Sequence, residues 1–253
     1  MASKRKTLLW ISSIVFFILM CRYFYLIHIA KADIDYTMHY ECIIAAAFFA
    51  WLTLIINLIT AKEANQKTSR ILFSLTDGNL LRIAMIFTLV ADYYLVALSE
   101  PDYFKGVSVF LGTQLFIFLH IFANEWDRKW RKINVFSRIL LTFVVIFVAY
   151  CLMKNMLDLL SIISIIYYCN LCANAFFAHR IGRGGLILTL GLILFALCDI
   201  NVGLAGLEEI YVGGFAEGSF LYNILHTEQD LVWIFYIPSQ TLIPLSLVFS
   251  QRK

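Results

Sequence analysis

The chain has 253 residues, of which 61% are hydrophobic, 16% are aromatic and only 15% are charged. Soluble domains are roughly 45–50% apolar and about 25% charged, and disordered chains contain few aromatic residues, so both classes are excluded. The net charge of +3 is too small to indicate a nucleic-acid-binding protein. About eight membrane spans of roughly 20 apolar residues would account for this composition, and we therefore predict a polytopic membrane protein.

Hydrophobic runs of membrane-spanning length recur along the whole chain. The connecting segments are short, and none is long enough to separate two domains. The expected fold class is all-α, a single domain over residues 1–253 built as a bundle of eight transmembrane helices. In chain order, we expect spans near residues 7–29, 40–61, 80–99, 104–123, 136–154, 158–178, 184–206 and 229–249.

The lysine and arginine residues predict the orientation of the helices. Sixteen of them fall at the two termini and in or next to the even-numbered loops, with Arg82 counted in the second loop and Arg138 in the fourth, and three fall in or next to the other loops. Because positively charged loops stay in the cytoplasm, we expect both termini to be cytoplasmic. Arg5 and Lys6 precede an apolar run that is too long for a signal peptide, so the first helix is expected to remain uncleaved. This pattern fits the plasma membrane and the endoplasmic reticulum membrane equally well.

Two aspartates stand out because they lie well inside expected spans, where a carboxyl group costs several kcal/mol and is a functional candidate. Asp92 lies on the third span and Asp199 on the seventh. Counted from the expected span ends at a rise of about 1.5 Å per residue, both lie about 10 Å below the outer surface. The two carboxyl groups are therefore expected at one level of the bundle. Arg22, on the first span, either extends its charge to the surface or acts as a counter-ion for one aspartate.

Further polar side chains fall in the same layer of the bundle. The sixth span carries polar residues three or four positions apart, a spacing that puts them on one helix face. For each of these side chains two interpretations stay open, namely hydrogen bonds that hold helices together and contacts with a ligand. The residues that we expect around the two aspartates are Gln114, Tyr167, Asn170, Asn174, Tyr236 and Gln240.

The order of these residues resembles the YhhN/TMEM86 family of eight-helix membrane proteins, the lysoplasmalogenases. The resemblance covers roughly half of the chain and depends on order and spacing. It depends on Ala91-Asp92 in the third span, on Phe104, Gly106, Phe110 and Gln114 in the fourth, on Cys198-Asp199 in the seventh, and on Tyr236 and Gln240 in the eighth. Three features depart from the family pattern. Ala91 stands in place of a glycine, Gln114 stands in place of a histidine, and a Lys-Pro pair near the second span is absent.

The resemblance implies hydrolysis of the vinyl ether bond of lysoplasmalogens to a fatty aldehyde and glycerophospho-ethanolamine or -choline. Asp92 and Asp199 would be the catalytic pair, one protonating the vinyl β-carbon and the other activating water. The polar residues around them would bind the amphipathic lysophospholipid, which would enter the site from the surrounding membrane lipid. No metal or cofactor is expected, and the sequence contains neither a zinc-binding nor a serine-hydrolase pattern.

A second class of function stays open. Paired intramembrane carboxyls also serve as proton relays, so the chain is alternatively a non-catalytic lipid-binding protein or a proton-coupled small-solute transporter. Transporters commonly contain internal repeats and pairs of broken helices. Here no repeat is visible, and Pro238 and Pro244 both lie in the eighth span. Release of aldehyde from a lysoplasmalogen would distinguish the two classes.

Overall fold

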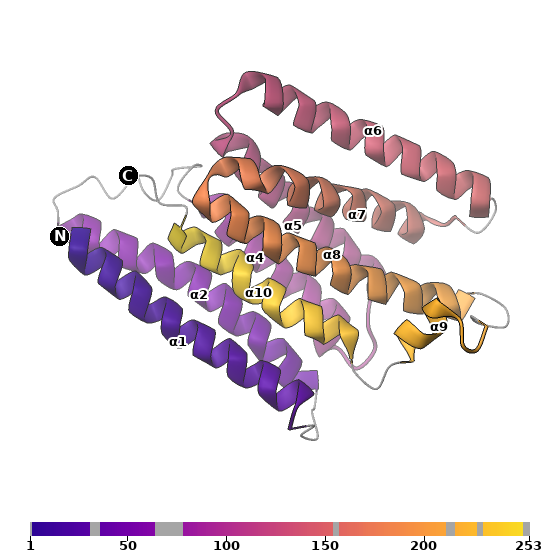
Figure 1. Ribbon diagram of the computed structural model, residues 1–253, viewed down its shortest axis with the longest axis horizontal. Helices are drawn as coiled ribbons and strands as arrows, with labels where there is room; N and C mark the ends of the chain where they lie inside the picture. The colour runs from indigo at the N-terminus through magenta and orange to yellow at the C-terminus, as the bar shows by residue number, and fades with distance from the viewer. Residues whose placement is uncertain are drawn as a thin grey trace.

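A computed structural model of the chain describes residues 2–30, 36–63, 78–153, 157–210, 216–226 and 230–249 (Figure 1). All regular elements in these ranges are helices, and eight of them are long and apolar enough to cross a membrane. The expected all-α bundle of eight transmembrane helices is confirmed, and the protein is a multi-pass membrane protein.

The spanning helices follow one another with short connections. They are α1 (Ala2–His28), α2 (Tyr36–Glu63), α4 (Asn79–Asp92), α5 (Tyr103–Asn124), α6 (Arg128–Met153), α7 (Leu159–Ala178), α8 (Arg183–Ile210) and α10 (Leu231–Phe249). The remaining elements are a π-helical segment after α4, η1 (Tyr93–Ala97), a 3₁₀ turn after α7, η3 (His179–Ile181), and a short helix, α9 (Phe220–Leu225).

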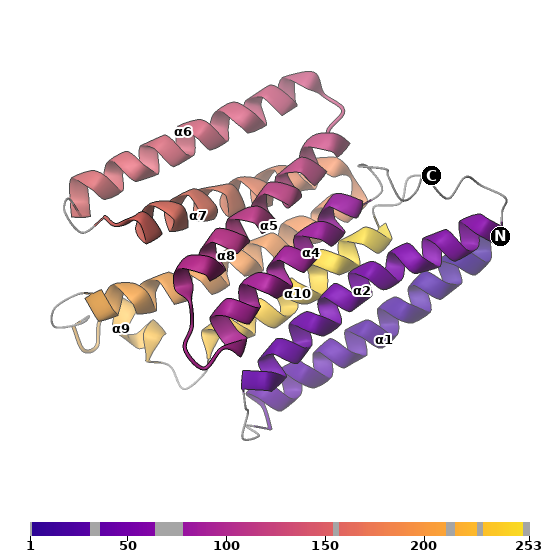
Figure 2. The same ribbon diagram turned by 180° about the vertical axis from the view of Figure 1, so that it is seen from behind.

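The first helix begins at the end of the bundle where the last helix finishes (Figures 1 and 2). The ring centroids of Trp10 on α1 and Phe249 on α10 lie 5.6 Å apart at this end. An even number of crossings requires this arrangement. We call it the predicted cytoplasmic end, because the charge pattern assigns the basic loops to that side, and we call the other the predicted outer end.

Two helices begin at the predicted outer end with an aspartate cap. Asp102 Oδ1 accepts a hydrogen bond of 3.0 Å from the backbone N–H of Lys105 before α5, and Asp158 Oδ1 accepts one of 2.7 Å from that of Ser161 before α7. The side-chain and then the backbone hydrogen bond from Lys105 lower the pKa of Asp102, and those from Ser161 lower the pKa of Asp158. Each cap satisfies backbone donors that would otherwise have no partner in the first helical turn.

Small residues allow the central helices to approach closely. A Cβ atom built on Gly191 of α8 would lie 2.9 Å from Ile243 Cγ1 of α10, and one on Gly112 of α5 would lie 2.6 Å from Phe87 Cδ1 of α4. Close backbone approach at small residues is a general device for packing helices in membranes. These contacts join α4 to α5 and α8 to α10.

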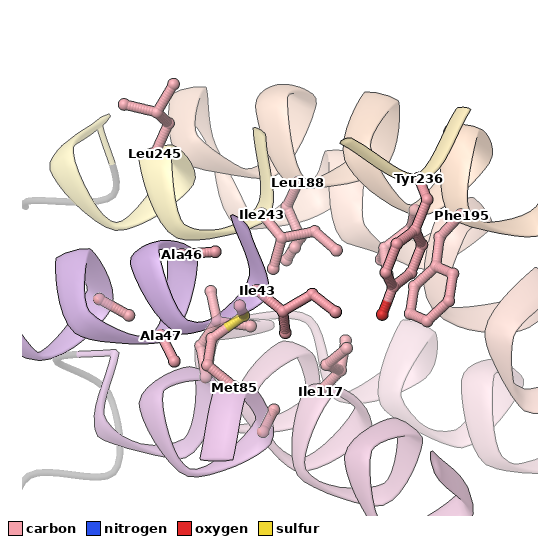
Figure 3. Close-up of a cluster of buried hydrophobic side chains, with 14 of the residues drawn as sticks. Ile43, Ala46, Ala47, Met85, Ile117, Leu188, Phe195, Tyr236, Ile243 and Leu245 are labelled. Carbon is pink, nitrogen blue, oxygen red and sulfur yellow. The ribbon is translucent and has the colours of Figure 1, made fainter. Parts of the chain in front are cut away.

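The buried core collects side chains from helices that are distant in sequence. Ile43 of α2, Met85 of α4, Ile117 of α5, Leu188 of α8 and Ile243 of α10 meet at the centre of the bundle (Figure 3). These side chains belong to one buried cluster among the described residues. The ring of Tyr236 lies beside Phe195 at one side of this core, and this pair leads into the candidate site.

The fifth span is the one whose limits were predicted wrongly. Seven spans agree with the expected limits within three residues, but the fifth begins at Arg128 rather than near residue 136. Hydropathy assigned the basic segment to a loop. Lysine and arginine are good helix formers, and Asp127 accepts a hydrogen bond of 2.8 Å from the backbone N–H of Lys129, so the helix starts before the apolar run. This helix, α6, lies at the edge of the bundle and packs against α7 (Figures 1 and 2).

Candidate functional site

The two predicted carboxyl groups lie in the half of the bundle nearer the predicted outer end. Asp92 is the last residue of α4 and is 3% exposed, whereas Asp199, on α8, is half-buried. The two are close enough for their charges to interact. Four helices contribute to this group, because each aspartate has its hydrogen-bond partner on a further helix.

Each aspartate accepts a hydrogen bond from a buried tyrosine. The hydroxyl of Tyr236, on α10, donates to Asp92 Oδ2 at 2.5 Å, and the hydroxyl of Tyr167, on α7, donates to Asp199 Oδ2. A hydroxyl that donates to a carboxyl orients it and offsets part of the cost of removing it from water. The structure thus brings together four of the sequence-predicted site residues, and we refer to them below as the Asp–Tyr cluster.

Two phenylalanines lie between the tyrosines of the cluster. Ring centroids are 5.4 Å apart for Tyr236 and Phe195, 5.5 Å for Phe195 and Phe110, and 5.7 Å for Phe110 and Tyr167. Trp233 extends the series, 5.3 Å from Tyr236. Aromatic neighbours at these separations pack favourably and exclude water. The tyrosine partners of both carboxyl groups are therefore joined by a continuous series of aromatic rings.

The backbone changes its helical form directly after Asp92. The α-helix ends at that residue and continues as the π-helical segment η1. Isolated π-helical turns inside longer helices are frequent at functional sites, because the extra residue redirects neighbouring side chains. The hydroxyl of Tyr40, on α2, donates to Leu89 O of the preceding turn at 3.2 Å and braces this part of the helix.

A second polar cluster lies deeper, around a buried arginine that sequence reasoning assigned to the fourth loop. Arg138, on α6, is 6% exposed. Its Nε donates to Asn134 Oδ1 at 2.7 Å, one Nη to Asn170 Oδ1 at 3.2 Å and the other Nη to Asn174 Oδ1 at 2.8 Å. Its guanidinium also lies 4.4 Å from the ring centroid of Phe118. We call this group the Arg138 cluster.

The Arg138 cluster contains three of the residues that were predicted to surround the aspartates. Asn170 and Asn174 bind the arginine, and Asn174 Nδ2 donates to the backbone O and the side-chain Oε1 of Gln114, at 2.9 Å in both cases. The expected single polar layer is in fact two clusters. The charge count missed the cause, because it assigned Arg138, at the predicted start of the fifth span, to the fourth loop; the earlier helix start places it ten residues into α6.

Two buried amide atoms have no hydrogen-bond partner among the described residues. They are Nε2 of Gln114, a donor, and Oε1 of Gln240, an acceptor. Both side chains are completely buried, on α5 and α10. Buried polar groups are normally paired, so each such atom marks a place where a ligand or a water molecule can bind.

Two further buried polar residues were not predicted from the sequence. Arg82, on α4, donates from Nε to Ala50 O and from Nη to Thr53 Oγ1 of α2, at 3.0 Å in both cases. His120, on α5, is 1% exposed. Arg82 had been assigned to the second loop, although it is the fourth residue of its helix. Arg22, by contrast, has an exposed side chain, as expected of a residue that extends its charge to the surface.

An ion pair links two connecting segments at the predicted cytoplasmic end. Arg180 Nε lies 2.6 Å from Glu125 Oε2, and the Arg180 guanidinium lies 4.1 Å from the ring centroid of Trp130. Burial raises the pKa of Glu125, but the hydrogen bonds from Arg180 and from the backbone N–H of Asp127 outweigh it and lower the pKa. The pair joins the α5–α6 connection to the turn after α7.

Comparisons with known proteins give no relative that assigns these residues a role. Within the described residues, no group of three or more histidine, cysteine, aspartate or glutamate side chains is placed to hold a metal ion. No protein-family model, no curated protein and no solved structure matches the chain.

Proposed function

We propose that the protein is a membrane hydrolase of lysoplasmalogenase type, which cleaves the vinyl ether bond of a lysophospholipid. The observation that carries this proposal is the Asp–Tyr cluster. Two carboxyl groups from different helices are held by tyrosine hydroxyls in an aromatic surrounding, close enough for their charges to interact. Carboxyl groups at this depth are costly, and a purely structural role needs only neutral polar groups.

Vinyl ether hydrolysis requires both forms of a carboxyl group. An acid donates a proton to the β-carbon of the double bond, which leaves an oxocarbenium ion at the ether carbon. A carboxylate stabilises this cation and removes a proton from the water molecule that attacks it. The resulting hemiacetal breaks its bond to the glycerol oxygen, and the products are a fatty aldehyde and the glycerophospho-alcohol. Because the two carboxyl groups interact, they titrate as a pair, and either one can begin as the acid.

The surroundings of the cluster suit an amphipathic substrate. Phe110, Phe195 and Trp233 provide an apolar surface for the alkenyl chain. The unpartnered amide nitrogen of Gln114 can donate to a glycerol or phosphate oxygen, and the unpartnered amide oxygen of Gln240 can accept from a glycerol hydroxyl group. Asn170 and Asn174, which were predicted to share this role, are instead occupied by Arg138. Asp199 is the more exposed of the two carboxyl groups, so we infer that substrate enters on its side.

The test is release of aldehyde from a purified lysoplasmalogen by the full-length protein in detergent micelles. We expect aldehyde from the wild type and none above background from Asp199→Asn. Asp158→Asn is the matched control, because it makes the same change at an exposed capping aspartate, where an amide oxygen still accepts the hydrogen bond.

If the wild type released no aldehyde from either the ethanolamine or the choline substrate, the hydrolase proposal would be wrong. Binding of the same lipid without turnover would then favour the lipid-binding alternative. Proton uptake coupled to a solute gradient in proteoliposomes would favour the transporter.

A further inference from the structure

One face of α6 changes from basic to apolar along its length. Arg128, Arg131 and Lys132 lie in its first two turns, and Val135, Phe136 and Ile139 follow. The spacings of three and four residues put them on one side of the helix. At about 1.5 Å per residue, the face extends about 16 Å from Arg128 to Ile139, roughly half the hydrocarbon thickness of a bilayer.

This face lines a groove beside the end of α5. The groove has a volume of about 460 Å³ and is lined by these six side chains and by Phe122 of α5. The apolar part is open to the surroundings, since Phe136 is 66% exposed and Ile139 is 65% exposed. α6 buries the smallest share of its surface among the eight spans, and α7 is its main neighbour (Figure 1).

In the part of the chain that the structure describes, no acidic side chain forms an ion pair with the basic residues of the groove. Asp127 accepts from the backbone of Lys129, and Glu125 pairs with Arg180, and neither lines the groove. Arg131 is fixed by donation from Nε to Glu125 O at 2.6 Å and by the ring of Phe122, 5.5 Å from its guanidinium carbon. Arg128 and Lys132 are exposed beside it. Trp126, 77% exposed, lies at the same level, where tryptophan is enriched at membrane surfaces.

We propose that this groove binds one anionic phospholipid from the surrounding bilayer. The anionic phosphate headgroup lies on Arg128, Arg131 and Lys132, and one acyl chain lies along Val135, Phe136 and Ile139. The apolar part excludes a water-soluble occupant, and the basic part selects an anionic headgroup over a neutral one. Basic pockets beside transmembrane helices at the cytoplasmic surface bind anionic lipids in this way. The site is separate from the Asp–Tyr cluster and does not depend on the proposed hydrolysis.

The experiment is native mass spectrometry of the full-length protein in a neutral detergent, titrated with phosphatidylglycerol or with phosphatidylcholine of the same acyl chains. We expect the first phosphatidylglycerol to bind more tightly than phosphatidylcholine. Each basic residue near the headgroup contributes about fivefold, so Arg128→Gln/Lys132→Gln should weaken that first binding by about 25-fold. The matched control is Lys129→Gln/Arg183→Gln, which removes the same charge at the same end of the bundle from residues outside the groove.

Equal losses in the two double variants would overturn the proposal, because the effect would then be one of general surface charge. Equal affinity for the two lipids in the wild type would also overturn it. A dimer in the spectrum that disappears in Arg128→Gln/Lys132→Gln would identify a second copy of the chain as the occupant instead. If the double variant does not fold, Lys132→Gln against Lys129→Gln makes the same comparison with an expected ratio of about fivefold.

Discussion

The Asp–Tyr cluster and the Arg138 cluster both place charged groups inside the bundle, but they satisfy them differently. The Arg138 guanidinium donates to three asparagine side chains and lies over an aromatic ring. Each aspartate receives one hydrogen bond from a tyrosine, and its carboxyl group has capacity for more. A charge with several partners on its own and a neighbouring helix holds those helices together, whereas an acid with a single partner can still exchange a proton. The comparison therefore assigns structure to the Arg138 cluster and chemistry to the Asp–Tyr cluster.

The largest effect is expected from removal of either acid. Asp92→Asn and Asp199→Asn should each lower kcat by about 10²–10⁴-fold, because an amide cannot protonate carbon or carry the balancing charge. The double variant should be little worse than either single one, since the two groups act as a unit. Aldehyde release measures this. The melting temperature should hold or rise, because a desolvation cost is removed. Full activity in both single variants would exclude the acid–base role.

Removal of a tyrosine hydroxyl should have the next largest effect. Tyr236→Phe and Tyr167→Phe keep the rings but take away the donor to each carboxyl, and hydrogen bonds to charged groups are worth about 1.5–3 kcal/mol. We expect kcat to fall by about 10–100-fold, and the pH dependence of kcat to shift because the acid–base pair loses a donor. Tyr40→Phe is the matched control, since its hydroxyl donates to a backbone oxygen near the same site. An equal loss in Tyr40→Phe would mean that the tyrosines act only through packing.

Substitution in the Arg138 cluster should lower stability and leave turnover almost unchanged. Arg138→Met leaves three asparagine oxygens without their donor, which should cost about 1–3 kcal/mol of stability and lower the melting temperature by several degrees. The kcat of the folded fraction should change little. Arg22→Met, at an exposed arginine within a span, is the control and should leave the melting temperature almost unchanged. Loss of turnover in Arg138→Met with no loss of stability would contradict the division between the clusters.

The amide of Gln240 should affect binding more than chemistry. Gln240→Ala removes a buried acceptor that has no partner among the described residues, so the protein loses no internal bond through that atom. We expect KM to rise by about 2–12-fold, the worth of one neutral hydrogen bond, with a smaller change in kcat. The same change at Gln114 also breaks the contact with Asn174 and should cost stability as well. A fall in kcat at constant KM in Gln240→Ala would place the amide in the chemical step.

The smallest effect is expected at the Glu125–Arg180 pair. A carboxyl whose pKa is lowered in the folded state stabilises it above the ordinary value of 4.5, and this contribution is lost as the pH falls through the lowered pKa. Between about pH 6 and pH 3, the melting temperature of the wild type should fall more than that of Glu125→Gln, by an amount equivalent to no more than about 1 kcal/mol. Glu217→Gln, at an exposed loop position, should follow the wild type. If the melting temperatures of all three proteins fell in parallel with pH, the Glu125–Arg180 pair would make no contribution to stability.

The sequence by itself determined the fold class and identified the two aspartates as carboxyl groups within apolar spans. Hydropathy reports the transfer of whole segments out of water, so it predicted all eight spans. For seven of them, both limits are correct within three residues. It also identified Asp92 and Asp199, because a carboxyl in an apolar run is conspicuous whatever its neighbours are. The spacing of Tyr167, Asn170 and Asn174 put them correctly on a face that meets other helices.

Only the tertiary structure decided which of these polar groups meet. Tyr167 and Asn170 are three residues apart on one face, yet the first binds Asp199 and the second binds Arg138. That division depends on the neighbouring helix at each level, which a one-dimensional pattern does not contain. The helix start at Arg128 was hidden for a related reason. Hydropathy counts each charged residue at its full cost in lipid, whereas Arg128 and Lys132 in the first turns of α6 are exposed at the end of the bundle. Arg138, further along the same helix, recovers much of its cost through partners on α6 and α7 that become its neighbours only when the bundle packs.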